Sequence, residues 1–151
     1  MLRAREWLLV LAVVAISTIV STWPLVQSPF LIPYHQDPLF TSWRLYQWTR
    51  NLFGNSPGGF FDGNIFYPSK DVLLFSDAIL LPALSVAPAI RAGLRPLFAY
   101  DLLIWASFLS AGLGMYALAR DVSGSRAGAL VAAAINTGAP YRIAHVHSSS
   151  R

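Results

Sequence analysis

The chain has no acidic, basic or histidine residue between Trp7 and Tyr34. A transmembrane helix needs about 20 consecutive apolar residues, and residues 7–26 supply them, with a tryptophan near each end as an interfacial anchor. Arg3 and Arg5 precede the run, so the positive-inside rule predicts a cytoplasmic N-terminus. A cleaved signal peptide also starts with basic residues and an apolar core. Because the run lacks a clean small-residue cleavage site, the pattern favours an uncleaved signal anchor.

Composition supports a membrane protein rather than a soluble one. Of 151 residues, 55% are hydrophobic and 12% charged, whereas an average soluble domain is about 45–50% apolar and about 25% charged. So few charged side chains cannot cover a globule, and the mean hydropathy of +0.50 agrees. The net charge of +4 comes from basic residues scattered beside apolar segments, which is typical of membrane topology and not of a nucleic-acid-binding stripe. With no cysteine, the chain has no disulfide and no thiolate metal site.

Two later segments complete the predicted membrane region. Residues 97–119 are apolar apart from Asp101, and residues 127–141 are small and apolar but short for a span. We therefore predict an all-α, multi-pass integral membrane fold with about three transmembrane helices, 7–26, 97–119 and 127–141. A stripe of small residues four apart lets a partner helix approach the middle span closely; it consists of Ala106, Ser110 and Gly114.

Residues 27–96 form a predicted extracytoplasmic loop rich in proline, glycine, asparagine and aromatic residues. Asp37 followed by proline is a typical helix start, and the mixture of aromatic and basic residues after it predicts an interfacial helix over 38–53. Residues 72–90 are apolar apart from Asp77, with two prolines. This pattern predicts a kinked or re-entrant segment.

The number of basic residues does not decide whether 72–90 crosses the membrane. If it crosses, Arg91 and Arg95 are cytoplasmic; if it does not, Arg120 and Arg126 are. The prolines and the acid within the segment slightly favour the second topology.

Several short motifs in series resemble the N-terminal part of bacterial GT-C-type membrane glycosyltransferase-like proteins, from about Pro33 to His147. The order and spacing of the motifs carry the resemblance more than any one of them does. They are His35–Pro38 (HQDP), Phe61–Pro68 (FDGNIFYP), Leu74–Asp77 (LFSD), Gly112–Arg120 (GLGMYALAR), Gly124–Arg126 (GSR) and Ala139–His145 (APYRIAH).

The resemblance implies an enzyme that transfers a sugar from a polyprenyl-phosphate donor to an extracytoplasmic acceptor. It implies a catalytic acid in the first extracytoplasmic loop, where Asp37 stands. It also implies that Arg120 and Arg126 are cytoplasmic and that the protein lies in the bacterial inner membrane. The next loop of the family usually carries an acidic or metal-binding cluster, whereas this chain has His145 and His147 and no acid there. We therefore expect no cofactor for this chain. A divalent metal is a candidate only for an intact enzyme. Because the family forms larger bundles, we expect an N-terminal fragment that is inactive alone.

Two carboxylates are the candidate catalytic groups. Asp37 can act as the general base for sugar transfer or simply cap a helix, a role that contributes about 1 kcal/mol. Asp77 is an ionisable residue near membrane depth, a functional signal, but an acid there can also complement a helix N-terminus. Three cations are candidates to neutralise the lipid phosphate leaving group: Arg44, Arg50 and Lys70.

The remaining residues leave alternatives open. Asp62 precedes glycine, which is typical of a turn. Six aromatic residues line a polyprenyl groove or anchor the loop at the interface: Trp43, Trp48, Phe60, Phe61, Phe66 and Tyr67. The alternative to the enzyme is a small non-catalytic membrane scaffold or accessory subunit that pairs through the small-residue stripe.

Overall fold

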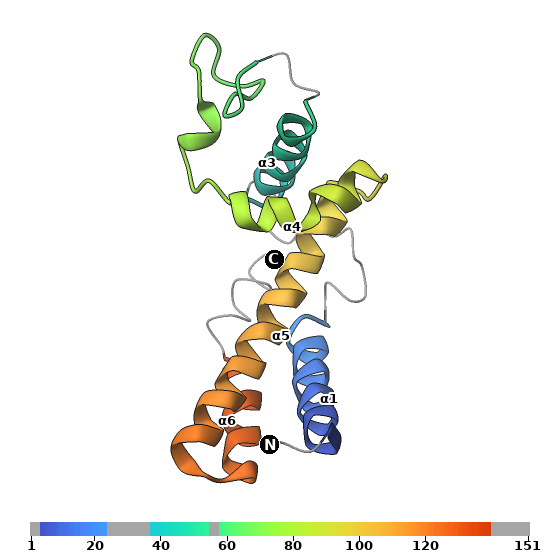
Figure 1. The fold of residues 1–151 in the computed structure, drawn as a ribbon, viewed down its shortest axis with the longest axis vertical. Coiled ribbons are helices and arrows are strands. Elements are labelled where there is room, and N and C mark those ends of the chain that lie inside the picture. Colours follow the sequence, from blue (N-terminus) through green and yellow to red (C-terminus); the bar gives the residue numbers. More distant parts are fainter. Residues whose placement is uncertain (1–3, 24–36, 55–57, 140–151) are drawn as a thin grey trace. The chain divides into compact units, whose positions relative to one another are not determined.

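The computed structural model describes residues 4–23, 37–54 and 58–139. Within these residues the protein is all-helical, with five α-helices, one short 3-10 helix and no strand (Figure 1). This confirms the predicted all-α class for the described residues. The elements in chain order are α1 (Ala4–Ser21), α3 (Asp37–Leu52), η1 (Val72–Leu74), α4 (Leu80–Arg91), α5 (Pro96–Ser123) and α6 (Arg126–Thr137).

Helix α5 is the only helix in the described ranges found long and apolar enough to cross a membrane by length and composition. Its 28 residues extend about 42 Å, against a hydrocarbon core of about 30 Å. Helices α1 and α6 have 18 and 12 residues, or about 27 and 18 Å. The predicted spans 7–26 and 127–141 run on into residues outside the described ranges. Three transmembrane helices therefore stay a prediction.

The chain divides into two compact units, residues 1–33 with 104–151, and residues 34–103. In the first unit, α1 and α6 pack together with the part of α5 that follows residue 103. Gly112 permits this close packing, because an added Cβ would lie 2.5 Å from Val14 Cγ1 and 2.6 Å from Thr137 Oγ1. The buried hydrophobic residues of this unit's main core are Val10, Val14, Tyr116, Ala129 and Ala133.

A polar cluster fixes the direction of the helices in this unit. Glu6 Oε1, in the first turn of α1, accepts a hydrogen bond from Tyr116 Oη at 2.8 Å. The same oxygen lies 3.2 Å from Arg126 Nε and 3.7 Å from Arg120 Nε. Arg120 is near the end of α5 and Arg126 begins α6. The start of α1 and the α5–α6 connection therefore lie at the same end of the unit, and α1 runs antiparallel to α5.

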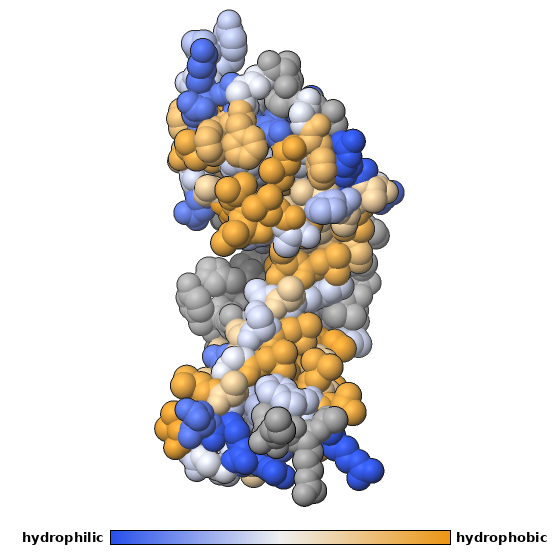
Figure 2. Space-filling model, viewed as in Figure 1, coloured by the Kyte–Doolittle hydropathy of each residue, from blue (hydrophilic) through white to orange (hydrophobic). Residues whose placement is uncertain are grey.

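The helices of the first unit expose many large apolar side chains, and apolar patches are visible on the face drawn in Figure 2. Monomeric soluble proteins rarely expose large contiguous apolar surface. Exposed large aliphatic side chains occur on all three helices: Leu8, Leu9, Leu11, Ile16, Ile19 and Val20 on α1, Leu118 and Val122 on α5, and Val131 and Ile135 on α6.

The second unit is built from α3, α4 and the first two turns of α5. Helices α3 and α4 pack directly on each other, and η1 closes the core. The buried hydrophobic residues are Leu45, Trp48, Leu73, Ala83, Val86, Ile90 and Ala99. Helix α3 corresponds to the predicted helix 38–53.

The segment 72–90 is not one kinked helix. It consists of η1, five non-helical residues, and then α4. Helix α4 starts at Leu80 after Ile79, the N-cap residue, which adopts the left-handed conformation (φ 40°). Pro82 falls in the first turn of α4, where backbone N–H groups have no helical partner in any case. Asp77 precedes this N-cap residue by two positions, and α4 begins three residues after Asp77.

Candidate functional site

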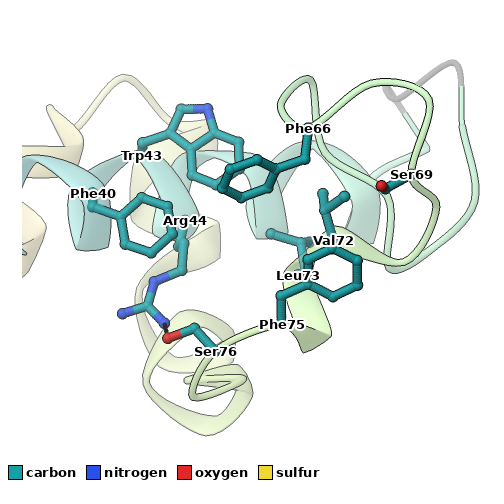
Figure 3. A pocket seen from close by; sticks show the side chains of 9 residues that line it. All are labelled: Phe40, Trp43, Arg44, Phe66, Ser69, Val72, Leu73, Phe75 and Ser76. Carbon is teal, nitrogen blue, oxygen red and sulfur yellow. Dashed lines mark hydrogen bonds between the residues drawn. The ribbon is translucent and has the colours of Figure 1, made fainter.

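A cavity of about 370 Å³ lies in the second unit, between one face of α3 and the loop that carries η1. Figure 3 shows that aromatic rings form most of its wall. The lining residues are Phe40, Trp43, Arg44, Phe66, Ser69, Val72, Leu73, Phe75 and Ser76. We call this cavity the aromatic groove.

Helical spacing creates the α3 wall of the aromatic groove. Phe40, Trp43 and Arg44 stand at positions i, i+3 and i+4, which share one helix face. The rings of Phe40 and Trp43 are stacked, with centroids 5.6 Å apart and planes at 14°. The Arg44 guanidinium carbon lies 4.8 Å from the Phe40 ring centroid, a cation–π contact. A second stacked pair, Phe66 and Phe75 at 6.2 Å, comes from the loop.

Arg44 places a positive charge at this mostly apolar wall. The residue is 8% exposed. Its Nη1 donates to the carbonyl oxygen of Asp77 at 2.6 Å and to Ser76 Oγ at 3.3 Å, and its Nη2 donates to Thr41 Oγ1 at 3.2 Å. These bonds join α3 to the segment before α4 and hold the guanidinium in place beside the groove (Figure 3).

Asp62 shapes the loop on the other side of the groove. Its Oδ1 accepts from the backbone N–H of Asp71 at 2.6 Å, and its Oδ2 accepts from the backbone N–H of Gly59 at 2.7 Å. These two hydrogen bonds, that from Asp71 first, hold the pKa of the Asp62 carboxyl below its ordinary value. Asp62 also closes a turn, since its N–H donates to the Gly59 carbonyl. This agrees with the turn expected from the sequence.

Polar side chains of α3 attach this loop to the helix. Asn51 Nδ2 donates to the carbonyl oxygens of Phe60 and Asp62, each at 2.8 Å. Trp43 Nε1 donates to Asn64 Oδ1 at 3.0 Å. At Gly63 an added Cβ would lie 2.9 Å from Val72 Cγ2 and 3.0 Å from Trp43 Cη2. The Phe-Asp-Gly-Asn sequence thus has a structural explanation, in which each polar residue holds the loop and the glycine admits the indole.

The structure separates the predicted site residues. Arg44 lines the groove, but Arg50 lines a different cavity and Lys70 is exposed on the loop near Asp62. Asp77 is exposed and is not among the lining residues, although its backbone carbonyl accepts a hydrogen bond from Arg44. Asp37 begins α3, and its side chain lies outside the described part of the chain.

Of the six aromatic residues predicted for a groove, some line the aromatic groove and others do not. Trp43 and Phe66 line the groove. Trp48 is buried and packs edge-on against Phe60 and Phe61, with centroid distances of 5.4 and 5.8 Å, whereas Tyr67 is 97% exposed. Sequence reasoning missed the other lining residues, which are Phe40, Ser69, Val72, Leu73, Phe75 and Ser76. The spacing of Phe40 to Arg44 was a usable signal, but the contribution of residues 75–76 depends on a loop path that has no periodicity.

Among the described residues, no three His, Cys, Asp or Glu side chains gather as a metal site would require. The histidines considered above, His35, His145 and His147, lie outside those residues. The described part of the site offers instead an aromatic-lined groove with a fixed guanidinium on its wall. Such a site can hold an apolar chain that ends in an anionic group, through ring contacts and charge-assisted hydrogen bonding.

No family model, curated protein or solved structure matches this chain.

Proposed function

We propose that the chain forms the first membrane helices and the first extracytoplasmic loop of an inner-membrane glycosyltransferase that uses a polyprenyl-phosphate sugar. The observation that carries this proposal is the aromatic groove with Arg44 on its wall. A polyprenyl phosphate is an apolar chain with an anionic end, and the groove offers complementary groups for both. The volume of about 370 Å³ suits the phosphate and the first isoprene units, with the remaining chain in lipid.

Asp37 is the proposed general base. It is the first residue of α3, the helix that also carries Phe40 and Arg44. In the proposed transfer the acceptor hydroxyl oxygen attacks the anomeric carbon, its proton passes to the Asp37 carboxylate, and the bond from that carbon to the phosphate oxygen breaks. The leaving phosphate carries the negative charge, which Arg44 stabilises.

The first unit supports the proposed topology. Helices α1 and α5 are antiparallel, since Glu6 contacts both Tyr116 and Arg120. If both helices span the membrane, their antiparallel directions require an even number of further crossings between them. The apolar segment considered for such a crossing is 72–90. A single crossing would be an odd number, so the antiparallel arrangement favours a segment 72–90 that does not cross. A noncrossing 72–90 segment puts residues 27–96 on one side of the membrane. With a cytoplasmic N-terminus, that side is extracytoplasmic and Arg120 and Arg126 are cytoplasmic.

Direct binding tests the groove. A short polyprenyl phosphate with a diazirine on its first isoprene unit is photolysed with the purified full chain in detergent. We expect crosslinks within residues 40–76 and a loss of most labelling in Phe66→Ser. The neighbouring Tyr67→Ser is the matched control, because Tyr67 is exposed and does not line the groove. Equal labelling of both variants would contradict the assignment.

Transfer activity tests Asp37. In an enzyme that contains this chain, we expect Asp37→Asn to reduce sugar transfer by roughly 100-fold or more, the range that general bases contribute, with membrane insertion unchanged. The product is measured as radiolabelled sugar on the acceptor. Near-normal transfer would remove Asp37 from the mechanism while leaving the binding result intact.

A non-catalytic scaffold is the second candidate, and one observation favours it. Ala106, Ser110 and Gly114 are exposed on α5, and an added Cβ at Gly114 meets nothing within 4 Å. A partner helix packing on this face would be lost when Ser110 and Gly114 are replaced by leucine. Loss of a co-purified partner without any polyprenyl-phosphate binding by the original chain would favour the scaffold over the enzyme.

A further inference from the structure

Helix α4 has two apolar faces, and the second unit covers only one of them. The covered face consists of the buried residues Ala83, Val86, Ala87 and Ile90, and α4 packs on α3. We call the exposed positions the outer face of α4; they are Leu81, Pro82, Leu84, Ser85, Pro88 and Ala89. No charged residue lies between Asp77 and Arg91. Because a helix at a water-facing surface normally carries charged or polar residues on its outer face, α4 does not have the composition of a helix that faces water.

The side chains of the outer face offer little to water. Leu81 is 78% exposed and Leu84 is 44% exposed. Ser85 is the one polar side chain of this face, and its Oγ donates to the carbonyl oxygen of Pro82 at 2.6 Å, so its hydroxyl hydrogen is already used within the helix. Burying a large aliphatic side chain contributes about 1.5–3 kcal/mol. Contact with an apolar phase would therefore stabilise this face.

The connection to α5 indicates which apolar phase is nearest. Helix α4 ends at Arg91 and α5 begins at Pro96, so residues 92–95 join them. The first two turns of α5 belong to the same unit, where Ala99 lies in the core to which α4 contributes. The part of α5 beyond residue 103 is about 30 Å long, enough to cross a hydrocarbon core of about 30 Å. If α5 spans, α4 is held at the membrane surface, and Figure 1 shows it running across the start of α5 and not along it.

We propose that the outer face of α4 lies in the membrane interface, in contact with lipids of the extracytoplasmic leaflet. Pro88 has no N–H and cannot donate to the carbonyl oxygen of Leu84. Water at the headgroups can satisfy such a carbonyl, whereas the hydrocarbon core cannot, so the interface is the favoured depth. The inference rests on the membrane location in the proposed function and not on sugar transfer. It makes α4 the element that holds the loop unit on the lipid surface.

Dyes attached to single cysteines test this contact, because the chain contains no cysteine of its own. Leu81→Cys and Leu84→Cys carry a nitrobenzoxadiazole dye on the outer face, and Lys70→Cys is the control at an exposed, charged loop position. The full chain is reconstituted into phosphatidylcholine nanodiscs that contain a lipid with a nitroxide near the headgroup end of its acyl chain. We expect the nitroxide to remove most of the fluorescence at Leu81→Cys and Leu84→Cys and little of it at Lys70→Cys.

Each other result would overturn the assignment. Equal quenching at all three positions would mean that the dye itself seeks lipid. Blue-shifted emission without quenching at Leu81→Cys and Leu84→Cys would mean that protein, such as a second copy of the chain, covers the face, and unshifted, unquenched emission would mean that it stays in water. Stronger quenching by a nitroxide at the methyl end of the acyl chain would place α4 in the hydrocarbon core. The crosslinking test of the aromatic groove uses none of these positions, so failure of this inference and failure of the proposed function can be told apart.

Discussion

At the scale of residues, the loop unit depends on polar groups that serve the backbone. Asp62 accepts from two backbone N–H groups, and Asn51 donates to two carbonyl oxygens. These bonds give a segment without regular secondary structure a defined path, because unpaired backbone groups in a packed loop are costly. Arg44 serves the same purpose for the segment before α4. The chemistry proposed for the aromatic groove therefore relies on side chains that also build its walls.

Asp62 makes the loop sensitive to acid. Its pKa is lowered in the folded state, so the hydrogen bonds it accepts are fully present above the ordinary aspartate pKa of about 3.9. They are lost as the pH falls through the lowered folded-state value. We expect Asp62→Asn to speed hydrogen exchange at the amides of Gly59 and Asp71 at neutral pH.

The same variant should remove the extra exchange that acid causes in the original chain, after correction for intrinsic rates. Asp71→Asn is the control, since the Asp71 side chain makes no cap bond and asparagine also tolerates the left-handed conformation found there. Unchanged amide protection in Asp62→Asn would contradict the role given to the carboxylate.

At the scale of elements, helix packing in the first unit depends on which small residues face inward. Gly112 and Gly114 are two residues apart on α5, yet their surroundings are opposite. Gly112 is buried between Val14 of α1 and Thr137 of α6, whereas Gly114 faces open space. Only Leu113 separates them in the sequence, and the periodic small-residue stripe included Gly114 but not Gly112.

These two glycines give a matched pair of alanine variants. Gly112→Ala forces a shift of Val14 or Thr137, and overpacking of this kind typically costs about 1–3 kcal/mol. Gly114→Ala meets no neighbour and should be neutral or stabilise the helix by up to about 1 kcal/mol. The thermal midpoint of the chain in detergent measures the difference. Equal midpoints for both variants would mean that α1, α5 and α6 do not pack as described.

At the scale of the whole molecule, the direction of α1 relative to α5 is the informative feature. A partly buried carboxylate at the start of α1 pairs with basic residues at the α5–α6 connection. If both helices span, this pairing fixes both of those points on one side of the membrane. The arrangement gives a physical basis for a choice that the count of arginines left open.

Single cysteines can test this topology because the chain contains none. Ser69→Cys and Ser123→Cys place thiols at exposed positions in the loop and at the end of α5. We expect a membrane-impermeant maleimide to label Ser69→Cys in intact spheroplasts and Ser123→Cys only after permeabilisation. If 72–90 crossed the membrane, both thiols would be labelled from outside.

The sequence by itself determined the helical class of the described residues, the helix at 38–53 and the turn at Asp62, because these depend on apolar periodicity and on local capping chemistry. Only the tertiary structure decided that Arg44 and Arg50 line different cavities, that the helix within 72–90 begins only at Leu80, and that Arg91 lines the same cavity as Arg50. Those facts depend on how α3 packs on α4 and on the path of the loop. Contacts between residues far apart in the chain leave no period in the sequence, so local patterns do not predict them.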